Sequence, residues 1–164
     1  MRKAVYLLCC LGIYAALLFG ATGQPLNVKA GVWQVEYNIK YSGLSPQLQA
    51  MMDHMTPQQK AAMGIAAPKT YKMCVKEKDL NKSWTEGDDN CRWKIVKSTS
   101  SDLEIHGTAC RAGDGEMDVK IHALDSEHVR ATLHGTGNEQ GSNVTINGDY
   151  TGKWMGATCP ADLK

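Results

Sequence analysis

The sequence has 164 residues and a formal net charge of +1, with 18 Lys and Arg residues against 17 Asp and Glu residues. A nearly neutral chain of interspersed charges lacks the basic surface that binds phosphate backbones, so the composition argues against a nucleic-acid-binding protein. A chain of this length buries only a modest core, which covalent cross-links commonly supplement in small domains.

An export signal is expected at the N-terminus. Two basic residues precede an apolar run over residues 4–20, and the small residues at 21–23 fit the positions that a signal peptidase recognises. We therefore expect residues 1–23 to be cleaved. Residues 24–164 then form a single β domain that is periplasmic or secreted and keeps no stable membrane anchor. An uncleaved transmembrane helix is the alternative, but the apolar run is short for a membrane span.

The first strand of the mature chain is predicted over residues 31–41. Aromatic and branched residues occupy every second position from Trp33 to Tyr41, with Tyr37 between them, and polar residues occupy the alternate positions from Gln34 to Lys40. This alternation is typical of a half-buried strand, here with an aromatic inner face.

A helical hairpin is predicted after this strand, over about residues 45–66. Ser45 is a good N-cap and is followed by a proline at the first helical position. The apolar residues that follow have helical spacing: Leu48, Met51, Met52 and Met55. The segment from Thr56 to Gln59 has the form of a capping box, so a second short helix should run to about Met63.

The remainder of the chain is predicted to form strands joined by turns rich in Gly, Asp, Asn and Ser. The expected strands are residues 71–76, 92–98, 103–110, 117–124, 128–136 and 144–154. Short strands at regular spacing, with consecutive neighbours antiparallel, indicate a mainly β protein. We predict an antiparallel meander that forms an open barrel or a sandwich.

The polar face of this meander carries His106, His122 and His134. The expected register places Glu104 across from His122 and Asp118 across from His134. A divalent metal site or a pH-sensitive patch is one interpretation of these residues. We favour the other interpretation, a solvated face with favourable cross-strand pairs.

Four cysteines remain after signal cleavage, and they are Cys74, Cys91, Cys110 and Cys159. An even number of cysteines in an oxidising compartment predicts two disulfides, with three connectivities to choose from. We favour Cys74–Cys91, which closes a local loop, and Cys110–Cys159, which ties back the C-terminus. A zinc site is the alternative, but it requires close cysteine pairs, which this spacing lacks.

Several segments together resemble a large bacterial family of small exported proteins of unknown function. They are an opening similar to Gly-Leu-Trp-Glu at residues 30–35, a Met- and Gln-rich insert at 47–63, Cys74, the Cys-Arg-Trp segment at 91–93 and a Trp-to-Cys ending at 152–159. The resemblance implies a bacterial, periplasmic setting and structural roles for the cysteines and tryptophans. It implies no activity, because the family has none assigned.

The Met-rich segment is the leading candidate for function. Thioether side chains adapt their shape, so this segment suits a hydrophobic surface for a small molecule or a protein partner. The residues expected to line that surface are Leu44, Leu48, Met51, Met52, Met55 and Met63, with Trp33 and Tyr37 beneath. An ordinary core-facing helix is one alternative, and a Cu(I) site made of Met51, His54 and Met55 is another.

Catalysis is not indicated by any motif in the sequence. It contains no nucleophile elbow, no HExxH and no Gly-rich phosphate loop, and paired cysteines leave no thiolate nucleophile. We therefore expect a non-enzymatic binding module without a cofactor. An enzyme with an unrecognised site in the barrel mouth is the remaining alternative.

Overall fold

The computed structural model describes residues 23–63, 65, 67–77, 80, 91–110, 114–139, 141–161 and 163. Apart from Gly23, the predicted export signal lies outside the described residues. Within them, no helix has the length and apolar character needed to cross a membrane.

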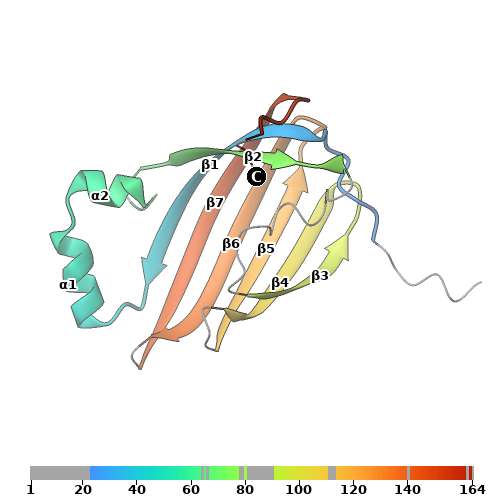
Figure 1. Ribbon diagram of the computed structural model, residues 1–164. Helices are drawn as coiled ribbons and strands as arrows, with labels where there is room; N and C mark the ends of the chain where they lie inside the picture. Colours follow the sequence, from blue (N-terminus) through green and yellow to red (C-terminus); the bar gives the residue numbers. More distant parts are fainter. Residues whose placement is uncertain are drawn as a thin grey trace, which may run out of the picture.

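Seven antiparallel strands form one curved sheet, which remains open (Figure 1). The strands are β1 (Gly31–Ser42), β2 (Lys69–Val75), β3 (Arg92–Ser98), β4 (Asp102–Cys110), β5 (Gly115–Ala123), β6 (His128–Glu139) and β7 (Ser142–Gly156). Their order in the sheet is β2-β1-β7-β6-β5-β4-β3. The mainly β, meander-type fold with an open sheet is thus confirmed. One connection differs from the simple meander, because β2 and β3 lie at opposite edges and β1 pairs with both β2 and β7.

The sheet has an apolar inner face and a polar outer face, as the alternation in the sequence predicts. The buried cluster includes Trp33 of β1, Leu103 and Ile105 of β4, Ile121 of β5 and Val129 of β6. These residues come together because the register pairs Leu103 with Ile121 and Val129 with Ala123 and Gly152. We call the side that carries this cluster the inner face.

The outer face carries the histidines as members of cross-strand pairs. Asp118 is across from His134, as predicted, but His122 is across from Asp102 instead of Glu104. The Nδ1 atom of His122 lies 2.9 Å from Asp102, and that of His106 lies 2.8 Å from Asp118. Among the described residues, no three His, Cys, Asp or Glu side chains gather into a group that could hold a metal ion.

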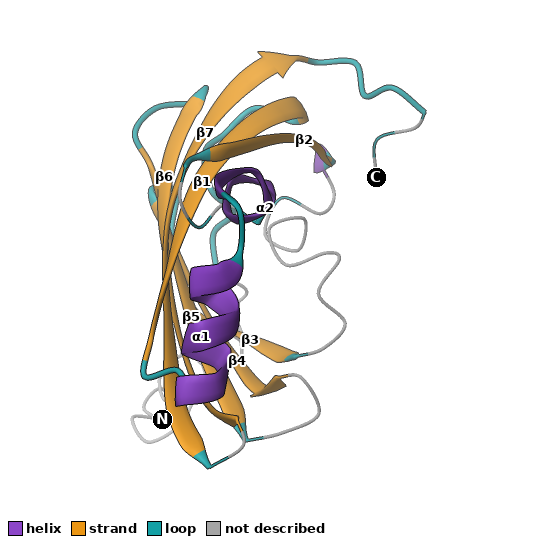
Figure 2. Ribbon diagram, turned by 90° about the vertical axis from the view of Figure 1, so that its left-hand side faces the viewer, coloured by secondary structure: helices purple, strands orange, loops and turns teal. Residues whose placement is uncertain are grey.

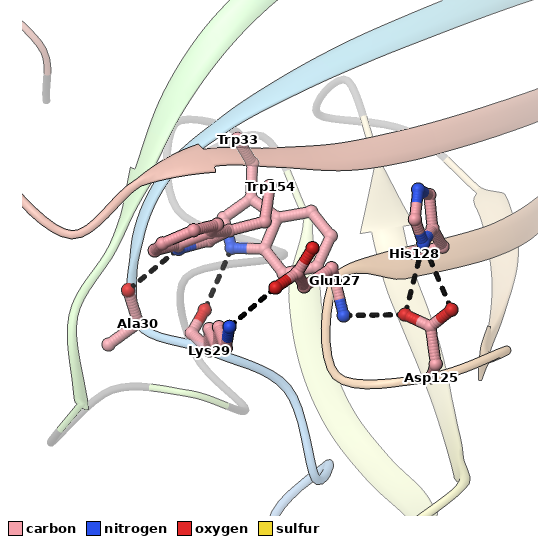
Figure 3. Close-up of polar contacts among 7 residues, drawn as sticks. All are labelled: Lys29, Ala30, Trp33, Asp125, Glu127, His128 and Trp154. Atoms are coloured by element: carbon pink, nitrogen blue, oxygen red, sulfur yellow. Dashed lines mark hydrogen bonds and ion pairs between the residues drawn. The ribbon is translucent and has the colours of Figure 1, made fainter.

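The segment before β1 closes one end of the sheet (Figure 3). Leu26 and Val28 are buried in the core cluster. The indole N–H of Trp33 donates to the carbonyl of Lys29 at 2.9 Å, and that of Trp154 donates to the carbonyl of Ala30 at 3.0 Å. The ammonium of Lys29 lies 4.6 Å from the centroid of the Trp154 ring. Two tryptophans from opposite ends of the chain therefore fix this segment in place.

Two short helices, α1 (Pro46–His54) and α2 (Pro57–Ala62), follow β1 as predicted and form a separate layer beside the sheet (Figure 2). Ser45 Oγ accepts the N–H of Leu48 at 3.3 Å and caps α1. At α2, Thr56 Oγ1 accepts the N–H of Gln59, whose side chain accepts the N–H of Thr56 at 2.8 Å. Local capping thus defines both helices.

The disulfides join Cys74 to Cys159 and Cys91 to Cys110, so the favoured connectivity was wrong. The sheet order explains the difference. Cys74 is on β2 at one edge, whereas Cys91 precedes β3 at the other edge. Because β1 lies between β2 and β7, the segment after β7 brings Cys159 to Cys74. Pairing of β3 with β4 brings Cys91 to Cys110.

Candidate functional site: two apolar cavities on the inner face

A cavity of about 400 Å³ lies between the helical hairpin and the sheet. We call it the outer cavity. Its hairpin side consists of Leu44, Leu48, Met51, Met52, Met55 and Met63. Its sheet side includes Tyr41, Met117, Gly135, Gly137, Val144 and Ile146. Met51 is 55% exposed and Met63 is 43% exposed, so the hairpin wall remains in contact with solvent.

The hairpin wall arises from the helical spacing of its apolar residues. Positions three and four residues apart share one side of a helix, which places Leu48, Met51, Met52 and Met55 together. This spacing normally marks a helix packed into a core. Here none of the residues of α1 and α2, all of which the structure describes, is buried. The methionines therefore form the wall of a cavity and not a packed interface.

Glycines on β6 provide the opposite side. A Cβ atom added at Gly137 would have only the Cα of Gly115 near it, at 3.5 Å, and one added at Gly135 would lie 3.7 Å from the terminal methyl of Met117. A larger side chain at Gly137 would therefore enter the cavity. Sequence reasoning missed these glycines. The sequence does show glycine at two alternate positions within a strand, a pattern that often marks a place where a ligand or another backbone comes close to the strand.

A second cavity of about 190 Å³ lies deeper on the inner face, and we call it the inner cavity. It is lined by Val35, Tyr71, Met73, Trp93, Met117, Val119, Ile121, Val129, Ala131, Leu133, Tyr150 and Gly152. Met117 lines both cavities, so they adjoin at this side chain. Among its described lining residues, the inner cavity has no charged side chain.

Tyrosines form one wall of the inner cavity. The Tyr37 ring stacks on Tyr150 at a centroid distance of 5.6 Å and meets the edge of Tyr71 at 5.7 Å. Burial raises the pKa of Tyr150 to about 12, and the neighbouring phenols, Tyr71 first, add to the rise. Burial and the nearby Tyr37 also raise the pKa of Tyr71. These hydroxyls therefore stay neutral at physiological pH and can donate hydrogen bonds.

The residues that the sequence singled out fall into two groups. Leu44, Leu48 and the four methionines of the hairpin line the outer cavity together. Trp33 is instead fully buried in the core cluster, and Tyr37 packs among tyrosines, so neither is among the described lining residues of either cavity. Of the three residues named for a Cu(I) site, Met51 and Met55 line the outer cavity. His54 is exposed and is not among the described lining residues.

Among the described lining residues, the acidic ones belong to the outer cavity alone. Asp114, Glu116, Thr136 and Asn138 contribute to its lining, and Asp114 and Glu116 are exposed. No Lys, Arg or His occurs among the described residues that line it. The side chain of Glu116 is on the outer face with that of Asp118, so Asp114 is the acidic side chain left at this cavity. The arrangement is thus a mostly apolar groove with an exposed aspartate beside it, a shape and chemistry suited to holding a ligand.

Residues 28–159 match the model of a family described as "Protein of unknown function (DUF3617)". The matched range includes every residue named above as lining either cavity. No curated protein and no solved structure matches the chain.

Proposed function

Because the chain belongs to DUF3617, a family of proteins of unknown function, we propose a role from its cavities: a non-enzymatic binding protein that holds an apolar ligand. The observation that carries the proposal is the outer cavity, whose hairpin wall consists of leucine and methionine side chains. A cavity of about 400 Å³ is within the usual size range of small-molecule sites, which are mostly apolar with few polar groups.

The hairpin is the part best suited to adapt to a ligand. Its helices are defined by local caps, and none of their residues, all described, is buried against the sheet. Methionine side chains rotate easily and fill irregular spaces, so they can follow the shape of the molecule that they enclose. Binding should therefore order this layer more than it changes the sheet.

We also propose that the protein works outside the cytoplasm, in the periplasm or as a secreted protein. The sequence begins with a predicted export signal. Two disulfides join all four cysteines of residues 24–164, which is compatible with an oxidising compartment. An apolar ligand there would be carried or sequestered away from water.

The proposal is tested with a fluorescent apolar probe and two matched variants. Met52→Asp places a carboxylate in the wall of the outer cavity and should weaken probe binding roughly tenfold or more, because the charge must lose water when the probe binds. Met155→Asp makes the same change at a methionine that is 50% exposed and is not among the described lining residues. It should leave the dissociation constant unchanged. Fluorescence titration measures both.

Two results would contradict the proposal. Failure of the wild-type protein to bind any apolar probe would mean that the hairpin only shields the sheet. Equal weakening by Met52→Asp and Met155→Asp would mean that the probe binds apolar surface in general and not this cavity.

A further inference from the structure

We propose that the two cavities form one continuous groove for a single-chain aliphatic amphiphile, with its tail in the inner cavity and an uncharged or cationic polar end in the outer cavity. This inference rests on the proposed binding function and adds the chemical class of the ligand.

Continuity of the groove follows from the strands beneath it. On β6, every second residue lines one cavity or the other without a gap: Val129, Ala131 and Leu133 line the inner cavity, and Gly135 and Gly137 line the outer cavity. The same holds on β5, where Met117 belongs to both. Gly137 is eight residues after Val129 on β6, which makes the groove about 27 Å long at roughly 3.4 Å per residue.

The inner cavity favours an aliphatic tail over a peptide. Its described lining consists of apolar side chains, tyrosines, one tryptophan and a glycine. The backbone N–H and C=O groups of the strands below are engaged in the sheet ladder, in which β6 pairs with β5 on one side and β7 on the other. Apart from the tyrosine hydroxyls and one indole, the described lining offers no side-chain partner, so a peptide placed there would bury most of its backbone groups unpaired, at a high cost in free energy. A hydrocarbon chain has no such groups.

A single chain also fits the size of the inner cavity. At about 190 Å³, the cavity is small for a drug-sized molecule, and an α-helix with side chains is about 10 Å across. The side chain of Met117, at the junction, is flexible and can move to admit a slender tail.

The outer cavity selects the polar end. Of its two acidic lining residues, Glu116 lies on the same side of β5 as Asp118, with its side chain on the outer face, so Asp114 is the one that can present a carboxylate. No Lys, Arg or His is among the described lining residues. An anionic group brought here would meet the like charge of Asp114 and lose water without gaining a cation. A hydroxyl or a quaternary ammonium would avoid that repulsion, and the ammonium would also gain attraction to the carboxylate.

The first experiment measures how binding depends on chain length. Octanol, decanol and dodecanol are titrated into the disulfide-intact protein by calorimetry, below the concentrations at which they aggregate. Affinity should rise about fourfold for each added methylene as the tail fills the inner cavity, the increment expected for a methylene leaving water. If octanol and dodecanol bind equally while the fluorescent probe of the previous section still binds, this inference is wrong and the proposed function stands.

The second experiment fills the inner cavity. Ala131→Met adds bulk inside the cavity, whereas Thr132→Met adds the same side chain on the outer face of the same strand. In Ala131→Met, the ratio of the dodecanol affinity to the octanol affinity should fall at least tenfold. In Thr132→Met it should be retained. Equal advantages in the two variants would overturn the placement of the tail, and the wild-type series above provides the test if Ala131→Met does not fold.

The third experiment compares polar ends at one chain length. Dodecyltrimethylammonium should bind at least as tightly as dodecanol, and dodecanoate at least tenfold more weakly than dodecyltrimethylammonium. Dodecanoate binding as tightly as dodecyltrimethylammonium would overturn the assignment of the polar end.

Discussion

Asp102 on the outer face receives several hydrogen bonds through a single carboxylate. The Nδ1 of His122 lies 2.9 Å from one of its oxygens, and Ser101 Oγ donates to the other at 2.7 Å. The bond from His122, and then the bond from Ser101, hold the pKa of Asp102 below its usual value of 3.8. Because this folded-state pKa is lowered, the stabilisation is present at neutral pH and is lost as the pH falls through the folded-state value.

Asp102→Asn should therefore destabilise the protein at neutral pH and have little effect in acid. The gap in free energy of unfolding between wild type and variant should begin to shrink near pH 4 and close at lower pH, as the wild-type carboxylate takes up its proton. Urea denaturation from pH 7 to pH 2 measures this gap. A gap that persists unchanged at pH 2 would show that the charge on Asp102 is not the cause.

The partner of His122 shows what alternation in a sequence can and cannot predict. The alternation of polar and apolar residues assigned His122 and Glu104 to the outer face, and both lie there. The residue across from His122, however, is Asp102. Sliding one strand by two residues keeps every side chain on its face, so alternation determines the face and leaves the register open. The register depends on turn geometry, which the sequence specifies less strongly.

At the scale of elements, the helical hairpin was the most predictable part of the site. Its boundaries follow from signals within a few residues: Ser45 with Pro46, and the box from Thr56 to Gln59. Its relation to the sheet was not predictable, because the same spacing of methionines suits a buried helix and a cavity wall. The glycines of β6 were missed because a glycine contributes to a cavity by having no side chain to fill it, and hydrophobic alternation does not register a missing side chain.

Thr56→Ala should loosen α2 without weakening the whole protein. Loss of the cap costs about 1 kcal/mol of helix stability, so amide hydrogen exchange within α2 should become roughly fivefold faster. The urea midpoint should change little, because none of the residues of α2, all described, is buried. Gln58→Ala, at an exposed helix position, is the matched control and should not accelerate exchange. A fall in the urea midpoint with Thr56→Ala would mean that the hairpin is coupled to the core.

At the scale of the whole molecule, the sheet order determines which distant segments meet. Pairing of β1 with both β2 and β7 joins the first third of the domain to its end, and the Cys74–Cys159 disulfide links the same regions. Strand positions could be predicted because each strand has its own alternation. The order could not, because pairing a strand with its nearest successor is only the commonest choice. The wrong disulfide prediction followed from that assumption.

The two disulfides should differ in how much they stabilise the protein. Cys74–Cys159 spans 85 residues and Cys91–Cys110 spans 19, and the chain-entropy treatment assigns them about 4.6 and about 3.2 kcal/mol. Replacing both cysteines of each pair with alanine, in separate variants, should reduce the free energy of unfolding in that order. Urea denaturation measures both reductions. A larger loss from the Cys91 and Cys110 variant would show that native contacts outweigh loop closure here.

The segment that closes the end of the sheet also affects when the protein can fold. Ala30 accepts its hydrogen bond from Trp154, 124 residues later, and the backbone N–H groups of Asn27 and Lys29 donate to Ser100 and Ser126. Whether the chain emerges from a ribosome or a translocation pore, this segment comes out before Ser100, Ser126 and Trp154. The segment therefore cannot complete its hydrogen bonds until Trp154 is available, so the end of the sheet is the part of the fold that closes late.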